Sequence, residues 1–251
     1  MISTSGHVQV ALKQISEEIA KLPKKEMSSD EQAFIQRYLG STKKYLGTKT
    51  ADNVKIARIV LQEQTKHTAD DLVCLLDHLF SANTFEEHAI GGKIFTLLKP
   101  EIRSQIPFTQ LEKWLAKAKG WVEIDVICQS SFTGAEALAR WNDWKNKINK
   151  FAKSDNISLR RASLVLQVPV VGKTNDPELR QLAFTTIEQL KHEKDGLITK
   201  AVSWLLRSLS VLNKEEVKDY LIKNESTLPR IAFRETMKKI ETGKKNGNKK
   251  K

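Results

Sequence analysis

The sequence predicts an all-α protein. Helical hydrophobic patterns follow one another along its 251 residues, with no persuasive hairpin or alternating strand. Trp121, Arg161 and Trp204 are separated by 40 and 43 positions, which matches the helix-pair repeat of HEAT and armadillo proteins. The net charge is +12. We therefore expect a curved right-handed solenoid of HEAT-like antiparallel helix pairs with a concave basic face.

Helix-start signals place the elements. Capping-box patterns, in which the first side chain caps a backbone N–H and a glutamate reaches back, occur at Ser28/Glu31, Thr84/Glu87, Thr109/Glu112 and Thr133/Glu136. Asn213/Glu216 is a weaker version, and Asp176 before Pro177 fits an N-cap followed by a first-turn proline. The predicted helices span residues 7–22, 29–39, 51–65, 69–81, 85–98, 109–118, 121–131, 134–152, 157–168, 177–192, 196–210, 214–223 and 227–241.

The segment 168–171 is β-branched, but Pro169 and Gly172 make it a poor strand, so we expect a loop there. Many short helices joined by short turns cannot each bury two faces in a compact bundle, whereas stacked helix pairs cover one another. A compact all-α bundle remains the alternative.

We expect residues 1–242 to form a single domain and residues 243–251 to form a disordered lysine-rich tail. The tail holds five lysines and no acid, so the remaining chain keeps a charge of +7. A basic body favours a polyanion such as nucleic acid as the partner, and a merely soluble basic protein is the alternative.

Composition excludes several classes of protein. Hydrophobic residues make up 40% of the chain, too many for a disordered protein, and no apolar run is long enough to span a membrane. The N-terminus lacks the pattern of a signal peptide. Two cysteines, Cys74 and Cys128, give neither a disulfide framework nor a metal set, and the five histidines lack metal-binding spacing. We therefore expect an intracellular protein of the cytoplasm or nucleoid, with no metal.

Trp121 and Asp125 are four residues apart and share one helix face. Arg161 lies on a largely apolar stripe, where it would either pair with a buried acid or reach a phosphate. Trp204 lies at a polar edge beside Lys200 and Arg207, which suits stacking on nucleic acid. The alternatives are a solvated aspartate beside a core tryptophan, a structural ion pair, and a tryptophan at the edge of the core.

Five short motifs resemble the AlkD-like DNA alkylation repair proteins, which are alkylpurine DNA glycosylases built from HEAT-like repeats. In order along the chain, the motifs are YLGTKT (45–50), WVEID (121–125), RRA (160–162), KAVSWLLR (200–207) and LPRIAFRE (228–235). Each is weakly specific, but the ordered set is fairly specific. The chain departs from the family pattern at Ala51, where proline is common, and in a longer loop over residues 170–176.

The resemblance implies that Asp125 is the catalytic carboxylate, that Trp121 and Trp204 face the lesion, and that Arg161 contacts a phosphate. We expect further DNA contacts from Arg160, Lys200, Arg207 and Lys49. The expected reaction is hydrolysis of the N-glycosidic bond of cationic N3- or N7-alkylated purines in duplex DNA, without a cofactor, by a monomer. A non-catalytic binder of damaged or branched DNA and a protein-interaction scaffold are the alternatives.

Overall fold

The computed structural model describes residues 6–23, 25–63, 68–129 and 132–245, so most of the predicted tail lies outside the described residues. These residues are helical with connecting turns, and β pairing among them is limited to an isolated parallel bridge between Lys44 and Thr84. The all-α prediction is confirmed. None of the described helices has the length and hydropathy needed to cross a bilayer.

Contacts divide the chain into two compact units, Met1–Ile127 and Cys128–Lys251. The single domain, the solenoid and the concave basic face remain predictions. The helices of the first unit are α1 (Gly6–Lys21), α2 (Ser29–Leu39), α3 (Thr50–Glu63), α4 (Ala69–Ser81), α5 (Phe85–Leu97), α6 (Pro100–Arg103), α7 (Phe108–Lys117) and α8 (Gly120–Cys128).

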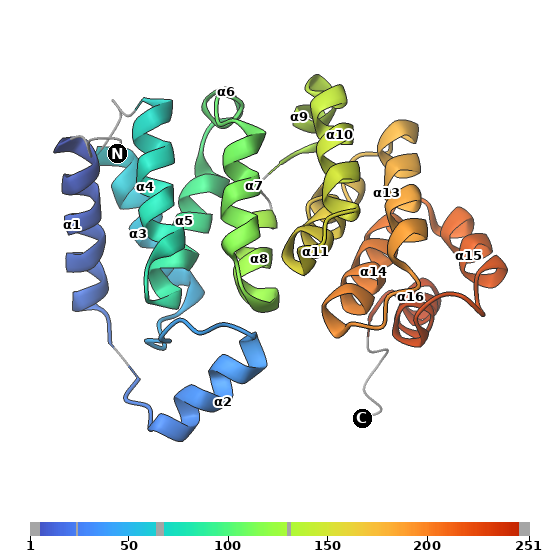
Figure 1. Ribbon diagram of the computed structural model, residues 1–251, viewed down its shortest axis with the longest axis horizontal. Helices are drawn as coiled ribbons and strands as arrows, with labels where there is room; N and C mark the ends of the chain where they lie inside the picture. Colours follow the sequence, from blue (N-terminus) through green and yellow to red (C-terminus); the bar gives the residue numbers. More distant parts are fainter. Residues whose placement is uncertain (1–5, 24, 64–67, 130–131, 246–251) are drawn as a thin grey trace. The chain divides into compact units, whose positions relative to one another are not determined.

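The first unit is built from two layers of helices (Figure 1). Helices α1, α4 and α7 pack in one layer, and α3 and α5 pack in the other. Helix α8 lies beside α5, as shown by the contact between His88 of α5 and the carbonyl group of Glu123 in α8. Fully buried side chains such as Leu75, Leu76 and Ile94 fill the space between layers. Helix α2 has no buried residue, and it projects away from the two layers.

Residues 40–49 connect α2 to α3 and are held by side chains from other helices. The carboxylate of Glu86, which is 0% exposed, accepts hydrogen bonds from the backbone N–H groups of Leu46, Gly47 and Thr48, at 3.0, 3.0 and 3.4 Å from Oε1. Ser41 Oγ donates to the carboxylate of Glu123. Because a buried carboxylate is costly without such donors, these bonds fix the path of the connection across α5 and α8.

Two glycines let the end of α2 touch the start of α8. Gly40 and Gly120 both have positive φ, at 69° and 63°, which glycine adopts without strain. A Cβ atom on Gly120 would lie 2.4 Å from the carbonyl oxygen of Gly40. Only glycine fits this backbone contact, so it sets where α8 begins relative to α2.

His88 is buried between two backbone carbonyl groups. Its Nδ1 lies 3.3 Å from Phe80 O and its Nε2 lies 3.0 Å from Glu123 O. A neutral imidazole has a single N–H, so only one of these contacts is a hydrogen bond in that form. Burial nevertheless lowers the pKa of His88 from 6.5, against the opposing effect of the two carbonyl groups and of Glu123.

The second unit also has two layers. Its helices are α9 (Gly134–Ala139), α10 (Trp141–Ala152), α11 (Ile157–Val165), α12 (Val168–Val171), α13 (Pro177–Leu190), α14 (Gly196–Leu209), α15 (Lys214–Lys223) and α16 (Arg230–Thr242). Helices α10 and α13 pack together in one layer, and α11, α14 and α16 pack in sequence in the other. Helix α13 contacts α14, and α15 contacts α16, so successive helices pair across the layers.

Several local predictions are confirmed. Ser28 and Thr133 form the expected capping boxes. Asp176 accepts from the N–H groups of Glu178 and Leu179, at 2.9 and 3.1 Å, with proline following it in the first turn.

Other local predictions are wrong. Helix α7 begins at Phe108 after Pro107, which puts Thr109 inside the helix rather than at its cap, and Asn213 makes no side-chain cap bond. The predicted helix 134–152 is interrupted at Arg140, whose φ of −122° and ψ of 38° leave helical geometry. The predicted loop at 168–171 is the short helix α12, because proline is tolerated in a first turn. Helix α6 was not predicted.

Replacement of Gly120 by alanine should destabilise the protein by about 2 kcal/mol or more, because left-handed strain of about 1 kcal/mol adds to the clash with Gly40. Gly243 is the matched control, since it has a φ of 72° but no atom within 4 Å of an added Cβ. Urea unfolding of both variants separates strain from clash. Equal losses at the two positions would contradict a close contact at Gly120.

Stability should fall as pH drops below about 6.5, because the unfolded chain then binds a proton that folded His88 does not accept. The free energy of unfolding stops falling, as far as His88 is concerned, once the pH lies below the pKa of His88 in the folded state. His88→Gln keeps a donor but does not titrate, so its urea midpoint should change less between about pH 5 and pH 7. His192→Gln, at an exposed position, is the control. Parallel pH profiles for wild type and His88→Gln would show that His88 is not responsible.

Candidate nucleic-acid site

Helix α8 places Trp121 and Asp125 on one face. They are four residues apart, so their side chains lie one above the other along the helix. Trp121 is partly exposed, whereas Asp125 is 4% exposed. Neighbouring Ile124 and Ile127 are fully buried, and they anchor the helix in the core of the first unit. A carboxylate of low exposure therefore lies next to an indole that solvent can reach.

The indole of Trp121 is fixed by the end of α2. Its Nε1 donates a hydrogen bond to the carbonyl oxygen of Tyr38 at 2.7 Å. The rings of Tyr38 and Trp121 meet edge to face, with centroids 5.7 Å apart and an interplanar angle of 84°. The adjacent contact between Gly40 and Gly120 brings these two residues together. Trp121 is thus held by a hydrogen bond and a ring contact from the same helix end.

Helix α11 carries Arg160 and Arg161 in the second unit, and their guanidinium groups have different surroundings. Arg161 is 4% exposed, and its Nη1 donates to Leu197 O in the first turn of α14 at 2.5 Å. Arg160 Nε lies 2.7 Å from Glu193 Oε1, and its Nη1 donates to the carbonyl groups of Ser154 and Asp155 at 2.8 and 2.9 Å. Four of the five N–H groups of Arg160 therefore have protein partners.

Helix α14 carries Lys200, Trp204 and Arg207 at spacings of four and three, which places them on one side of the helix. Lys200 is exposed and Trp204 is partly exposed. Arg207 Nε lies 3.3 Å from Ser203 Oγ and 3.7 Å from Glu235 Oε2 of α16. Burial lowers the pKa of Arg207, while the charge of Glu235 opposes this effect.

Glu235 and Tyr38 were missed by the sequence prediction. Glu235 accepts a hydrogen bond from Ser203 at 2.7 Å and pairs with Arg207 and Lys245, so it ties α14 to α16 beside Trp204. It lies in the motif at 228–235, which marks the segment but not this contact. No sequence signal indicated Tyr38, because its role comes from a backbone carbonyl and a ring edge.

The predicted residues therefore form two sets. Trp121 and Asp125 share α8 in the first unit. In the second unit, α11 carries Arg160 and Arg161 and packs against α14, which carries Lys200, Trp204 and Arg207. Lys49 is exposed just before α3. The predicted row joining Trp121, Arg161 and Trp204 remains a prediction, as do the roles of all these residues. In the described part of the chain, no three His, Cys, Asp or Glu side chains gather as a metal site requires.

Comparison with known proteins identifies the family. Residues 20–240 match the model of a family described as DNA alkylation repair enzyme. A solved structure described as a predicted DNA alkylation repair enzyme from Enterococcus faecalis has the same fold, with a TM-score of 0.69 at 19% sequence identity. The alignment covers 85% of this chain and 96% of that chain. No curated protein matches the chain significantly. Because the family model covers most of its length, this chain belongs to the DNA alkylation repair enzyme family.

Proposed function

We propose that the protein is a monofunctional DNA glycosylase that removes cationic N3- or N7-alkylated purines from duplex DNA. One observation carries this proposal: a carboxylate of low exposure, Asp125, shares a helix face with an indole fixed by neighbouring contacts, in a chain of the DNA alkylation repair family. A negative charge beside an aromatic face suits a substrate that becomes positive as it reacts.

The protein does not have to protonate the base that leaves. An alkylated purine with a positive charge takes the bonding electron pair as the N-glycosidic bond breaks, and it leaves as a neutral base. Positive charge then builds on the sugar carbon. The Asp125 carboxylate stabilises that charge and orients the attacking water, whose oxygen bonds to the same carbon as its proton is lost. The products are the free base and an abasic sugar.

Low exposure strengthens this role of Asp125. Electrostatic attraction between opposite charges grows as water is excluded, so a carboxylate that is 4% exposed acts more strongly on a nearby cation than a solvated one. The indole face of Trp121 adds cation–π attraction, typically about 0.5–2 kcal/mol. Trp204 and Arg161 remain predicted as a second indole and a phosphate contact.

Among the predicted DNA contacts, Lys200 and Lys49 fit phosphate binding best. Both side chains are exposed, and neither shows a hydrogen bond or ion pair to another described residue. Arg160 and Arg207, by contrast, already have protein partners that stabilise the second unit. Removing either arginine would therefore change packing as well as any contact with DNA.

Asp125→Asn should lower the release of N7-methylguanine from methylated duplex DNA by about a hundredfold or more, because it removes the charge that stabilises the sugar cation. Affinity for the duplex should change little. Asp143→Asn, at an exposed position on α10, is the control for the same change of side chain. Wild-type excision by Asp125→Asn would reject the carboxylate role. Absence of base release by the wild-type protein would favour a non-catalytic DNA binder.

Lys200→Gln should weaken duplex binding to a similar degree for all sequences and reduce the slope of log affinity against log salt by about 0.9, the value for one phosphate. Lys194→Gln is the matched control, since Lys194 is also exposed in the second unit but lies in the turn before α14. Fluorescence anisotropy at several salt concentrations gives the slopes. A slope that is equal in both variants would argue against a phosphate contact at Lys200.

A further inference from the structure

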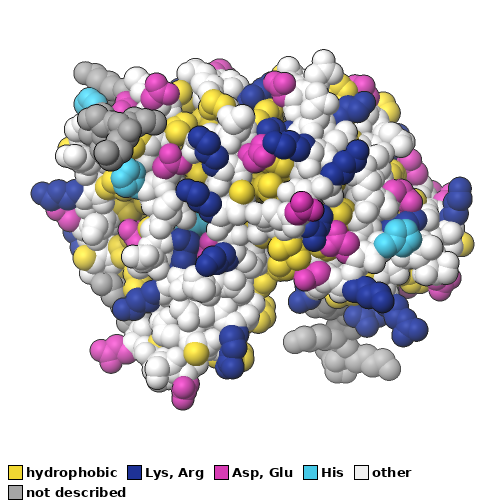
Figure 2. Space-filling view, viewed as in Figure 1, with side chains coloured by type: hydrophobic (Ala, Val, Ile, Leu, Met, Phe, Trp, Pro, Cys, Tyr) yellow, Lys and Arg dark blue, Asp and Glu magenta, His cyan; other side chains and the backbone are white. Residues whose placement is uncertain are grey.

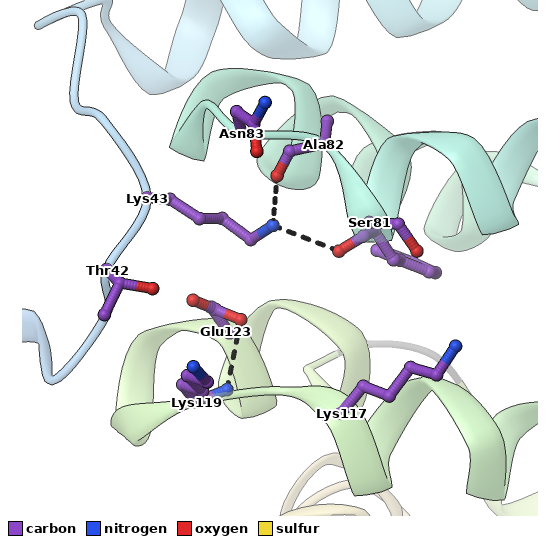
Figure 3. A pocket seen from close by; sticks show the side chains of 9 residues that line it. Thr42, Lys43, Ser81, Ala82, Asn83, Lys117, Lys119 and Glu123 are labelled. Carbon is purple, nitrogen blue, oxygen red and sulfur yellow. Dashed lines mark hydrogen bonds between the residues drawn. The ribbon is translucent and has the colours of Figure 1, made fainter.

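A polar cavity of about 310 Å³ lies in the first unit (Figure 3). The α2–α3 connection, the end of α4 and the turn between α7 and α8 surround it. Its described lining consists of Thr42, Lys43, Phe80, Ser81, Ala82, Asn83, Lys117, Lys119 and Glu123. Glu123 is two residues from both Trp121 and Asp125, so its side chain leaves α8 on nearly the opposite side.

Positive charge is in excess in this cavity. Three lysines line it against a single described carboxylate, that of Glu123. Both carboxylate oxygens are already engaged: Oε1 accepts from Ser41 Oγ, and Oε2 accepts from the backbone N–H of Lys119 at 3.0 Å. Glu123 thus serves to hold the start of α8, and the lysine charges are only partly compensated.

Lys43 is the most constrained of the three lysines. Its Nζ donates to the carbonyl oxygens of Phe80, at 3.1 Å, and Ala82, which places the ammonium at the C-terminal end of α4 (Figure 3). An ammonium has three N–H donors, so these two bonds leave one more. Burial lowers the pKa of Lys43 and the charge of Lys119 lowers it further, while Glu123 and Glu87 oppose these effects. A bound anion would stabilise the charged form of Lys43 against this cost of burial.

The remaining polar groups are donors that solvent can reach. Thr42, Asn83, Lys117 and Lys119 are exposed, and their side chains show no hydrogen bond to another described residue. Hydroxyl, amide and ammonium groups together suit a tetrahedral oxyanion. The cavity is large enough for such a group together with several waters, because one water occupies about 30 Å³ in the liquid.

We propose that this cavity binds one phosphate group, held by Lys43, Lys117 and Lys119 with help from Thr42 and Asn83. The phosphate comes either from the backbone of a nucleic-acid strand or from a free phosphomonoester. The site does not depend on base excision, and it is separate from the assignment of Asp125 as the catalytic carboxylate.

The first test is titration of the full-length protein with inorganic phosphate, followed by backbone amide NMR. Saturable shifts are expected at residues 42–43, 81–83 and 117–119, and the pKa of Lys43 should rise on binding. Lys117→Gln/Lys119→Gln should weaken binding at least tenfold. The matched control is Lys55→Gln/Lys99→Gln, which removes the same charge from exposed positions of the same unit outside the cavity. Equal affinity in both double variants, or shifts that do not saturate at the cavity, would overturn the proposal.

The second test identifies the source of the phosphate. If a DNA backbone occupies the cavity, Lys117→Gln/Lys119→Gln should reduce the salt slope of duplex binding by about 0.9 relative to the control pair. If a free phosphomonoester is the ligand, the slope should be equal in the two double variants while glycerol phosphate competes with inorganic phosphate. Asp125→Asn should bind inorganic phosphate like the wild type, so failure of the excision proposal and failure of this one give different results.

Discussion

The backbone contact between Gly40 and Gly120 is the constraint on which the first unit's candidate site depends. It joins the end of α2, a helix with no buried residue, to the first residue of α8. Trp121 follows directly and reaches the Tyr38 carbonyl, while Ser41 reaches Glu123 two residues further on. The approach of two chain segments with no side chain between them therefore fixes the indole, and the helix period then sets the place of Asp125.

The same connection shows how a mostly polar segment is positioned without a core of its own. Its backbone N–H groups are bound by Glu86, and its Lys43 side chain is bound by the end of α4. Both are charged groups meeting backbone dipoles, which is favourable when one partner is a helix terminus or a set of converging N–H groups. Helix α2 is held at its C-terminal end by the contacts of Tyr38 and Gly40 with α8 and by this anchored connection, rather than by burial of a hydrophobic face.

Much of the fold was predictable from the sequence, for reasons that are local. Helical periodicity and caps such as Ser28 and Thr133 depend on residues within a few positions, so they located most helices correctly. The break at Arg140 and the helix at Val168–Val171 were not predictable, since both run against local preferences.

The spacing of Trp121 and Asp125 on α8 followed from the sequence. The hydrogen bond from Trp121 to Tyr38 could not be predicted, because 83 residues separate the partners. The pairing of Arg160 with Glu193 and of Arg207 with Glu235 was hidden for the same reason.

The hydrogen bond from the Trp121 N–H to Tyr38 limits how this indole could distinguish one base from another. Indole has a single hydrogen-bond donor and no acceptor, so a ring whose donor is already bound to the protein offers a ligand only its faces and carbon edges. Such a surface interacts with a ligand through the ligand's charge and shape. It cannot read the hydrogen-bond donors and acceptors that distinguish adenine from guanine. Selection of a nucleotide by this residue would therefore depend on the charge of the damaged base rather than on whether that base is adenine or guanine.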